Sequence, residues 1–380
     1  MSTECGSIQE NDYDIIVLGG GLNGLAAALA LSESDLSIAL VENSDLTQKQ
    51  TPPSRYDSRV CALTEASYCF LDNLAVWNEV DCSRVCEFDR VEAWDAEGIG
   101  RIVFHAREAG HLQLGRIAEN SVMLSGMLKR LAASQVKCFD NTEVTGLEKT
   151  SSRISLLLAD NKVITAKLLI AADGAHSKVR QWSFIPQIRR DCLHHAIICT
   201  VKTRTSHQHC AWQVFLESGP LAFLPLPAVK EDNGQKAHYH SVVWSLKPEK
   251  AREVMAMDDN CFCEALSHAG EACVGVVEQA SSRTCIPLSQ QHALTYVKDR
   301  VVLVGDAAHT VHPLAGQGVN LGFLDVAVLA EEILKAHHQE NDPGNPQILQ
   351  RYWRRRQKYN FIMQGAMEFF QHIYNQNALP

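Results

Sequence analysis

Short apolar runs separated by helix-forming segments open and close this chain of 380 residues. Residues 13–18 are largely apolar and rich in β-branched side chains, which is typical of a strand buried in a parallel sheet. An alanine-rich, helix-forming segment includes 25–31, and a second apolar run lies at 37–41. The run 301–304 near the other end has the same character and also precedes a helical segment. This alternation predicts an α/β fold with parallel strands.

Between these ends the pattern becomes strand-like. The runs 195–201, 211–216 and 238–244 are rich in β-branched and aromatic residues, which predicts strands of a mixed or antiparallel sheet. Residues 91–94 are expected in the same sheet, and Asp-Asn-Gly at 232–234 indicates a turn between two of its strands. We expect this sheet to form a second domain that packs over a site built by the first.

The fold predicted for the whole chain is therefore α/β, with a Rossmann-like domain, a second domain built on the mixed or antiparallel sheet, and C-terminal helices. Because the strands of the first domain lie far apart in the sequence, that domain must be assembled from separate segments. The helical region near the end is broken at 342–346, where two prolines and a glycine occur. The predicted boundaries are 1–77, 112–182 and 285–335 for the first domain, 78–111 and 183–284 for the second, and 336–380 for the C-terminal helical segment.

The first strand leads into a glycine-rich turn. Residues 19–24 fit the pattern G-x-G-x-x-G, and Glu42 ends the second apolar run. In this pattern Gly19 makes the tight turn, Gly21 lets a pyrophosphate approach the backbone, and Gly24 allows the helix to pack closely on the strand. An acid at the position of Glu42 accepts hydrogen bonds from ribose hydroxyls, which favours FAD or NAD over NADP. An ordinary glycine-rich turn would explain the glycines but not the strand, helix and acid in register.

Two later motifs follow strands of the same kind. The run 167–172 ends at Asp173-Gly, which taken alone is most often only a turn. A second such strand ends just before Asp306, and the segment 312–325 then opens a helix with Gly-Gln-Gly-Val-Asn. Glycines at a helix start let backbone N–H groups approach a ligand, and the helix dipole there favours negative charge. We therefore expect an electron-rich or anionic group at this point.

Together the three motifs resemble those of the flavin-dependent aromatic hydroxylases that carry one FAD and no separate nicotinamide domain. The segment 312–325 is similar to a motif of the ubiquinone-biosynthesis branch, and 115–121 and 219–226 also read like that branch, most of all like its 2-polyprenylphenol 6-hydroxylases. The resemblance covers roughly residues 12–360. It implies hydroxylation of a hydrophobic polyprenylated phenol, with FAD as cofactor, NADH or NADPH as transient reductant, and dioxygen as co-substrate.

The resemblance also implies roles for individual residues. The residues expected to bind FAD are Gly19, Gly21, Gly24 and Glu42 at the ADP part, Val144 at the adenine, Arg59 and Asn120 at polar contacts, Asp173 near the flavin and the nicotinamide, Asp306 at the ribitol, and Gly318, Val319 and Asn320 at the pyrimidine edge. The expected substrate pocket consists of Phe223, Leu224, Pro225 and Pro313. An equal alternative is that Phe223 is simply a core side chain. No side chain is singled out as a catalytic acid or base.

Composition narrows the choice of partners. The net charge is −9, and no basic run is suited to following a nucleic acid. The basic segment 351–358 fits a solvated helix face better than a site for acidic lipid. The 13 cysteines are scattered, which indicates a reducing compartment, and neither they nor the histidines have the spacing of a metal site. We expect no metal and no nucleic acid.

Location and activity each leave alternatives open. Residues 1–12 are polar and acidic, and no apolar stretch reaches the roughly 18–20 residues of a membrane span, so a cytoplasmic protein is expected. The apolar positions 363, 367, 369, 370 and 373 of the last helix indicate core packing or, alternatively, contact with the inner membrane or a biosynthetic complex. The rival activities are a flavin reductase that transfers no oxygen, and a non-catalytic member of such a complex that holds FAD.

Overall fold

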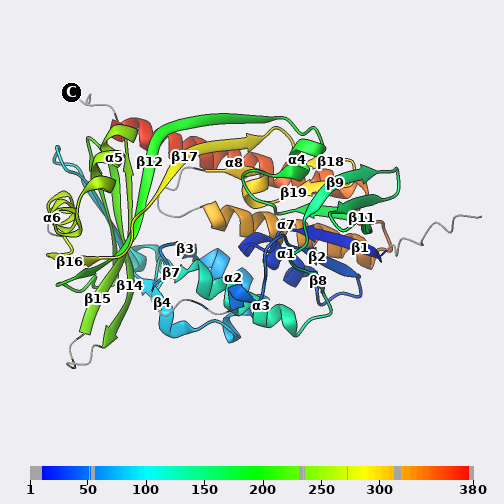
Figure 1. Cartoon of the computed structure of the whole chain (residues 1–380), viewed down its shortest axis with the longest axis horizontal. Helices are drawn as coiled ribbons and strands as arrows, with labels where there is room; N and C mark the ends of the chain where they lie inside the picture. Colours follow the sequence, from blue (N-terminus) through cyan, green and yellow to red (C-terminus); the bar gives the residue numbers. More distant parts are fainter. Residues whose placement is uncertain are drawn as a thin grey trace, which may run out of the picture.

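The computed structural model describes residues 11–50, 52, 56–230, 234, 236–271, 273–311 and 318–375. Two large sheets lie at opposite ends of the long axis, and β12 (Gln187–Thr203) and β17 (Thr284–Ala293) run between them along one side (Figure 1). The predicted combination of an α/β part, a second mixed sheet and C-terminal helices is confirmed.

The first large sheet contains the strands predicted near both ends of the chain. Its eight strands are β1 (Asn11–Leu18), β2 (Ile38–Val41), β8 (Lys137–Phe139), β9 (Val144–Lys149), β10 (Ile154–Leu158), β11 (Val163–Ala171), β18 (Val297–Lys298) and β19 (Val301–Leu303). β1 pairs in parallel with β2 and β11, β2 with β8, and β11 with β19. Because parallel strands end at the same edge, the turns that follow them meet at one edge of the sheet.

Helices pack on this sheet and connect it to the end of the chain. They include α1 (Leu22–Leu31), α3 (Asn120–Ala132), α7 (Gly318–His338) and α8 (Pro346–Asn375). The predicted break at 342–346 separates α7 from α8. Tyr352 anchors α8, because its fully buried hydroxyl donates to the carbonyl oxygen of Leu303 at 2.8 Å. Within the described parts of the chain, no helix is both long and apolar enough to span a membrane.

The second large sheet contains the strands predicted in the middle of the chain. Besides β12 and β17, its strands are β5 (Arg90–Asp95), β6 (Arg101–His105), β13 (Cys210–Leu216), β14 (Gly219–Lys230), β15 (Lys236–Leu246), β16 (Val277–Ala280) and β20 (His309–Thr310). β5 and β13 pair in parallel, and the other pairs are antiparallel. α5 (Pro248–Ala256) and α6 (Asp259–Ala269) pack against this sheet and share its core. The predicted turn at 232–234 lies mostly outside the described residues.

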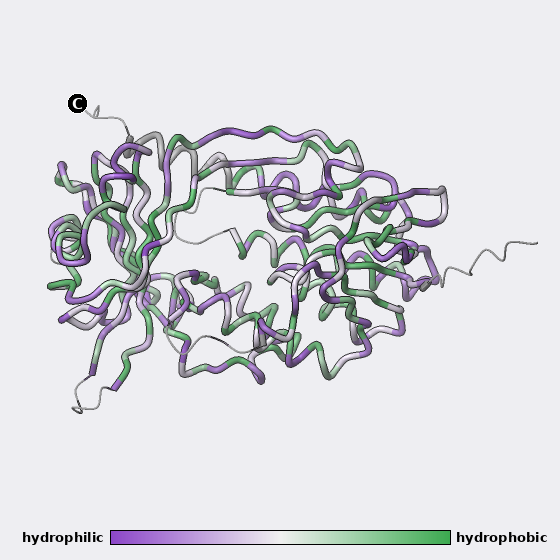
Figure 2. The backbone as a smooth tube through the Cα atoms, viewed as in Figure 1, coloured by the Kyte–Doolittle hydropathy of each residue, from purple (hydrophilic) through white to green (hydrophobic). Residues whose placement is uncertain are grey.

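The part of β12 that bridges the two sheets differs from the strands around it. Figure 2 shows hydrophobic colouring along the central strands of both large sheets, whereas this bridging part is mostly hydrophilic. Its first five residues are exposed, and they pair with β17, which pairs in turn with β20. The predicted domain boundary at 285 falls at the start of β17, a strand that pairs with β12. The division of the chain into domains therefore stays a prediction.

A small three-stranded sheet between the two large ones was not predicted. It consists of β3 (Val60–Thr64), β4 (Val85–Phe88) and β7 (Gly115–Glu119), and α2 (Glu65–Asn73) follows β3. Ile117 of this sheet shares a buried cluster with Leu224 and Leu226 of β14. The cluster joins the small sheet to the nine-stranded sheet.

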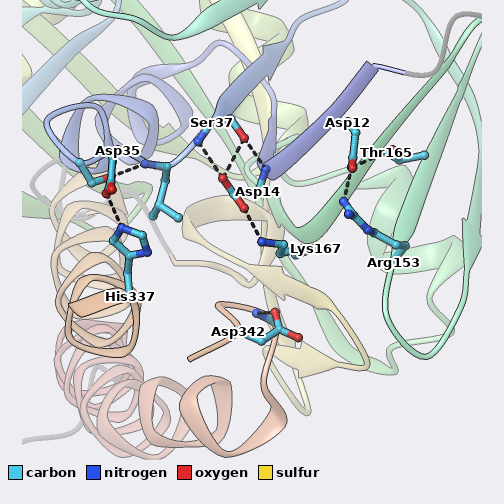
Figure 3. A network of polar contacts seen from close by, with 12 residues as sticks. Asp12, Asp14, Asp35, Ser37, Arg153, Thr165, Lys167, His337 and Asp342 are labelled. Atoms are coloured by element: carbon cyan, nitrogen blue, oxygen red, sulfur yellow. Dashed lines mark hydrogen bonds and ion pairs between the residues drawn. The ribbon is translucent and has the colours of Figure 1, made fainter. Parts of the chain in front are cut away.

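A group of polar side chains lies toward the opposite edge of the parallel sheet, near the start of β1 (Figure 3). Asp14 accepts hydrogen bonds from the backbone N–H of Ser37 at 2.9 Å and from Lys167 Nζ at 2.7 Å. Asp35 pairs with His337 at the end of α7. We call these five residues the outer network. They tie β1, β11 and α7 together at the edge away from the three motifs.

Candidate active site

The three predicted motifs meet at the carboxyl edge of the eight-stranded sheet. β1 leads into Gly19, β11 into Asp173, and β19 into the short turn that carries Asp306. Since β11 pairs with both β1 and β19, the motifs follow three adjacent strands. Arg180 of α4 (Lys178–Trp182) joins the last two motifs, because its guanidinium donates to the carbonyl oxygen of Ala307 at 2.7 Å. The chain thus brings together segments that lie far apart in sequence.

The three glycines of the first turn differ in why the structure has glycine there. Gly19 has φ +113°, and a Cβ atom there would lie 2.4 Å from the carbonyl oxygen of Ala172. A Cβ atom on Gly24 would lie 1.8 Å from the carbonyl oxygen of Gly19. A Cβ atom on Gly21 would meet nothing within 4 Å. The fold itself therefore requires Gly19 and Gly24, whereas Gly21 leaves open space in front of the start of α1.

Glu42 holds the glycine turn against the end of β2. Its Oε2 accepts from the backbone N–H of Gly20 at 2.5 Å, and its Oε1 accepts from Ser44 N–H at 3.1 Å and Lys49 Nζ at 3.2 Å. Burial acts to raise the pKa of Glu42, but the hydrogen bonds from Ser44 and Gly20 and the charge of Lys49 lower it overall. The carboxylate is therefore ionised at neutral pH.

Two cavities open along this edge, and His176 lines both. The smaller has a volume of about 460 Å³ and the larger about 1050 Å³. The predicted residues that line the smaller cavity are Gly19, Gly21, Glu42, Val144 and Asp173. The predicted residues that line the larger cavity are Arg59, Asn120, Asp306, Gly318 and Val319.

Two of the residues predicted to bind a cofactor, Gly24 and Asn320, do not line these cavities. Gly24 lies against the backbone of the glycine turn. Asn320 fastens the start of α7 to β3, since its Nδ2 donates to the carbonyl oxygen of Ala62 at 2.8 Å and its Oδ1 accepts from Thr64 N–H at 3.0 Å. Because α7 begins at Gly318, the backbone N–H groups of its first turn have no partner within the helix.

Four buried side-chain oxygens around the cavities have no hydrogen-bond partner among the described residues. They are the Oδ1 atoms of Asn23 and Asn120 and the Oγ1 atom of Thr310 at the larger cavity, and the Oδ1 atom of Asp173 at the smaller. Asn23 is wedged in place, because a Cβ atom on Gly305 or on Gly322 would lie 2.2 Å from its Nδ2. A buried acceptor without a partner costs free energy. These oxygens therefore indicate a ligand that carries donors such as hydroxyl or amide groups.

Asp306 lines the larger cavity, and the residue is exposed there. Nearby protein atoms displace part of the water around the carboxyl group and so raise the pKa of Asp306, while the neighbouring His309 and Arg59 act in the opposite direction. A carboxyl group held in this way is stabilised by a ligand that donates hydrogen bonds to it.

A buried ion pair holds the loop that carries Arg59. Glu119 is fully buried and accepts two hydrogen bonds from Arg84, at 2.8 and 2.6 Å, and one from the backbone N–H of Asp57 at 2.5 Å. Asp57 in turn accepts from the backbone N–H groups of Arg59 at 3.0 Å and Ser121 at 3.2 Å. The loop is thereby fixed to the start of α3 beside the larger cavity.

Comparison with known proteins agrees with this geometry. The sequence matches the family described as FAD binding domain over residues 12–360. It is 33% identical to the 3-demethoxyubiquinol 3-hydroxylase of Escherichia coli (strain K12), over 97% of this chain and 91% of the relative. It is 30% identical to the mitochondrial ubiquinone biosynthesis monooxygenase COQ6 of Xenopus tropicalis, over 97% of this chain and 87% of the relative. The chain belongs to the FAD-dependent hydroxylases of ubiquinone biosynthesis.

Solved structures share the fold of this hydroxylase. PqsL of P. aeruginosa, crystallised with 2-aminobenzoylacetate, superposes with a TM-score of 0.78 at 20% identity and covers 93% of this chain and 94% of its own. The p-nitrophenol 4-monooxygenase PnpA of Pseudomonas putida DLL-E4 gives 0.74 at 17% identity, over 98% and 91%. At these identities the likeness shows the fold alone. The predicted family and the predicted cofactor, FAD, are confirmed by the family match.

Three of the four residues predicted to form the substrate pocket of the hydroxylase are described by the structure, and these do not line the larger cavity. Phe223 is fully buried in the core of the nine-stranded sheet, where a Cβ atom on Gly270 would lie 3.0 Å from its ring. Leu224 belongs to the cluster on the other face of β14, and Pro225 is buried in the same strand. Pro313 lies outside the described residues. Side chains of a strand alternate between its faces, and here both faces of β14 are covered.

The larger cavity is lined instead by residues that the sequence pattern did not single out. Ile286, Pro287 and Leu288 of β17 line the larger cavity, as do Asn23 and His176. Asn23 occupies a variable position of G-x-G-x-x-G, so only its polar side chain at a helix start was available as a signal. Among the residues that the structure describes, no cluster of His, Cys, Asp or Glu side chains is arranged to hold a metal ion.

Proposed function

We propose that this chain is a flavin-dependent monooxygenase that hydroxylates the ring of a polyprenylated phenol in ubiquinone biosynthesis, with NADH or NADPH as reductant and dioxygen as the oxygen donor. The observation that carries the proposal is the meeting of three motifs on two cavities that share His176. The names of the relatives support the substrate class, since one is a 3-demethoxyubiquinol 3-hydroxylase and another a ubiquinone biosynthesis monooxygenase.

The residues around the two cavities fit FAD. The unpartnered oxygens of Asn23 and Asn120 and the carboxyl of Asp306 offer acceptors for hydroxyl and amide donors, and Gly21 leaves space at a helix start where phosphate binds well. When bound, FAD supplies electron transfer from the nicotinamide and activation of dioxygen. The residues proposed to hold it are Gly19, Gly21, Gly24, Glu42 and Val144 at the ADP part, Arg59, Asn120 and Asp173 at polar contacts, Asp306 at the ribitol, and Gly318, Val319 and Asn320 at the pyrimidine edge.

The residues of the chain orient the reactants, exclude water and stabilise charge. No side chain is assigned as an acid or a base. The first turn of α7 presents backbone N–H groups, and these stabilise negative charge on a group placed before it. Val60, Ile286 and Leu288 form an apolar part of the wall of the larger cavity, which favours a ring that carries a hydrocarbon chain over a charged one. The apolar wall also keeps water away from the ring, which suppresses side reactions.

The ring position is proposed from the sequence resemblance as the 6-position of a 2-polyprenylphenol. A relative at 33% identity is named for a different position, and it belongs to the same branch. Product analysis therefore decides the position. A 6-hydroxylated product supports the proposed position. A product hydroxylated at another carbon would overturn the proposed position but not the proposed reaction class.

Contact with the inner membrane or with a biosynthetic complex through the C-terminal helices is part of the same proposal. Phe361 and Ile362 of α8 are 69% and 67% exposed, and Arg354 and Lys358 lie on the same helix. Exposed apolar side chains beside basic ones suit an anionic lipid surface. Sedimentation with vesicles that contain anionic lipid tests this: we expect Phe361→Ser to reduce the bound fraction. Equal binding of the variant and the unaltered chain would contradict it.

Reduction kinetics test the proposed activity. FAD-reconstituted protein is mixed anaerobically with NADH or NADPH, with and without a short-chain prenylphenol, and then exposed to dioxygen. We expect the phenol to accelerate flavin reduction and a hydroxylated phenol to form. Reduction that yields only hydrogen peroxide or a reduced acceptor would favour a reductase. Flavin that binds and is never reduced would favour a non-catalytic role.

A further inference from the structure

A buried carboxylate outside the predicted site lies behind it, at the centre of a polar network. Asp325 of α7 is fully buried, and its Oδ2 accepts from the backbone N–H of Gly305 at 3.2 Å and lies 2.5 Å from His309 Nε2. Its Oδ1 accepts from Arg356 Nε at 2.7 Å and from Asn360 Nδ2 at 3.1 Å. We call these five residues the inner network. Each oxygen of the carboxylate thus has two hydrogen-bonding partners, and all four partners are held in fixed positions by the fold.

The inner network connects the middle of α8 to the turn that carries Asp306. Gly305 directly precedes Asp306, has φ +58°, and lies against Asn23 so closely that a Cβ atom could not be added. His309 lies in β20, just before the segment that leads to α7. Arg356 and Asn360 belong to α8, and they line neither cavity. Asp325 is therefore the contact through which a distant helix reaches the cofactor turn.

The charges of the network keep Asp325 ionised. Burial acts to raise the pKa of Asp325, but His309 and Arg356, through charge and hydrogen bonds, lower it overall. An ionised carboxylate accepts stronger hydrogen bonds than a neutral one, and it accepts them from both sides at once. The backbone of Gly305 is held accordingly.

We propose that Asp325 is a positioning residue for FAD: it orients the turn that carries Asp306, and α8 acts on the cofactor site through it. The inference rests on the proposed FAD site. A carboxylate that only held α7 to α8 would need no contact with the turn after β19. Asp325 contacts both α8 and the turn after β19. Glu332, seven residues further along the same helix, contacts only α8.

Glu332 provides the matched control. It is 6% exposed, and it accepts from Arg351 Nε at 2.7 Å and from Arg355 at 2.9 Å, so it also ties α7 to α8 by a carboxylate held between two groups. Neither it nor its two partners line the cavities. The variants Asp325→Asn and Glu332→Gln therefore both weaken a carboxylate contact between the helices, and only the first touches the cofactor turn. The arginines of Glu332 are 50% and 42% exposed and Arg356 is 5% exposed, so Glu332→Gln is expected to lower the unfolding temperature less.

The experiment measures two quantities for each variant of the full chain: the unfolding temperature of the apoprotein, and the Kd of FAD from the quenching of flavin fluorescence. We expect both substitutions to lower the unfolding temperature. We expect only Asp325→Asn to weaken FAD binding, by roughly 10- to 100-fold, as loss of a hydrogen bond to a charged group implies. Arg356→Lys, which keeps the charge but loses the planar geometry, is expected to give an intermediate Kd.

Two results would overturn the inference: an unchanged Kd for Asp325→Asn, or an equal loss of affinity for Glu332→Gln. If Asp325→Asn does not fold, Asn360→Ala takes its place, because it removes a neutral donor to Asp325, together with contacts to Arg356 and Tyr296, and keeps the carboxylate. An unchanged Kd for that variant would also overturn the inference. Failure of the proposed function gives a different pattern. An unaltered chain that binds no FAD contradicts the proposed site, and one that binds FAD without hydroxylating contradicts only the proposed reaction.

Discussion

The inner and outer networks both connect α7 to the eight-stranded part of the molecule, but they lie toward opposite edges of its sheet. In the inner network Asp325 is fully buried, and its neighbour His309 is 1% exposed. In the outer network the Lys167 side chain is 41% exposed, and that of Asp35 is 88% exposed (Figure 3). Similar polar groups therefore meet in two very different environments.

Burial, rather than the number of hydrogen bonds, decides how much such a network stabilises the fold and fixes its geometry. Water screens the outer network and replaces any partner that is lost, so each exposed pair adds little stability. The inner network has no such replacement, and removal of one member leaves the others buried without partners. The inner network therefore fixes the geometry of the adjoining turn, whereas the outer one does not.

The largest effect is expected for Asp325→Ala. The substitution leaves the buried Arg356 guanidinium without its carboxylate, which destabilises proteins by about 3–5 kcal/mol. Urea unfolding of the apoprotein measures this difference. A loss below about 1 kcal/mol, the range of an exposed pair, would break the comparison between the two networks.

An effect of opposite sign is expected for Asp306→Asn. Loss of water around the carboxyl group raises the pKa of Asp306, so its ionised form costs the folded apoprotein stability as pH rises from the unfolded carboxyl pKa through the folded one. Because Asp306 is exposed at the cavity, this cost is small. The variant should therefore be more stable than the unaltered apoprotein at neutral pH, and equal to it in acid where both carboxyls are protonated. FAD should nevertheless bind more weakly. Asp299→Asn, at an exposed position, is the control, and a variant less stable than the unaltered chain at neutral pH would contradict the expectation.

A smaller effect is expected for Asp14→Asn in the outer network. Burial acts to raise the pKa of Asp14, but hydrogen bonds from Lys167 and Ser37 lower it overall. Its contribution, about 0.5–1 kcal/mol or less, is therefore present above the unfolded carboxyl pKa and is lost as pH falls through the folded one. Urea unfolding at several pH values and salt concentrations measures it, and high salt should reduce it. A loss as large as that of Asp325→Ala would show that exposure does not separate the networks.

The smallest effect is expected for His337→Ala. Its partner Asp35 is exposed, and although the hydrogen bond from His337 lowers the pKa of Asp35, water takes over that contact in the variant. We expect no measurable change in unfolding temperature or in the Kd of FAD. A shift in that Kd would mean that the outer edge of α7 also acts on the cofactor site.

The parallel sheet and its motifs were predictable because their signals are local. The strands at 13–18, 37–41 and 301–304 show as apolar runs, and β1, β2 and β19 lie there. Gly19 is required by a positive φ and Gly24 by close packing, and G-x-G-x-x-G encodes both directly. Ten of the predicted residues accordingly line the two cavities.

The rest depended on contacts between distant segments. Phe223 was placed in a substrate pocket from a single apolar strand, yet one face of β14 is covered in the core that includes α6 and the other face is covered by the small sheet. Asn23 and Asp325 gain their roles from Gly305, which lies far from Asn23 in the sequence. The periodicity of apolar residues carries no information about contacts between distant segments, so Asn23 and Asp325 were not predicted.

The central claim is that this chain transfers an atom of dioxygen to a phenol ring, and isotopic labelling tests it most directly. FAD-loaded protein is supplied with NADH or NADPH and a short-chain prenylphenol, once with labelled dioxygen and once with labelled water, and the product is weighed by mass spectrometry. The account predicts one labelled oxygen in the product from dioxygen and none from water. Flavin turnover without label in the phenol, or label that comes from water, would contradict it.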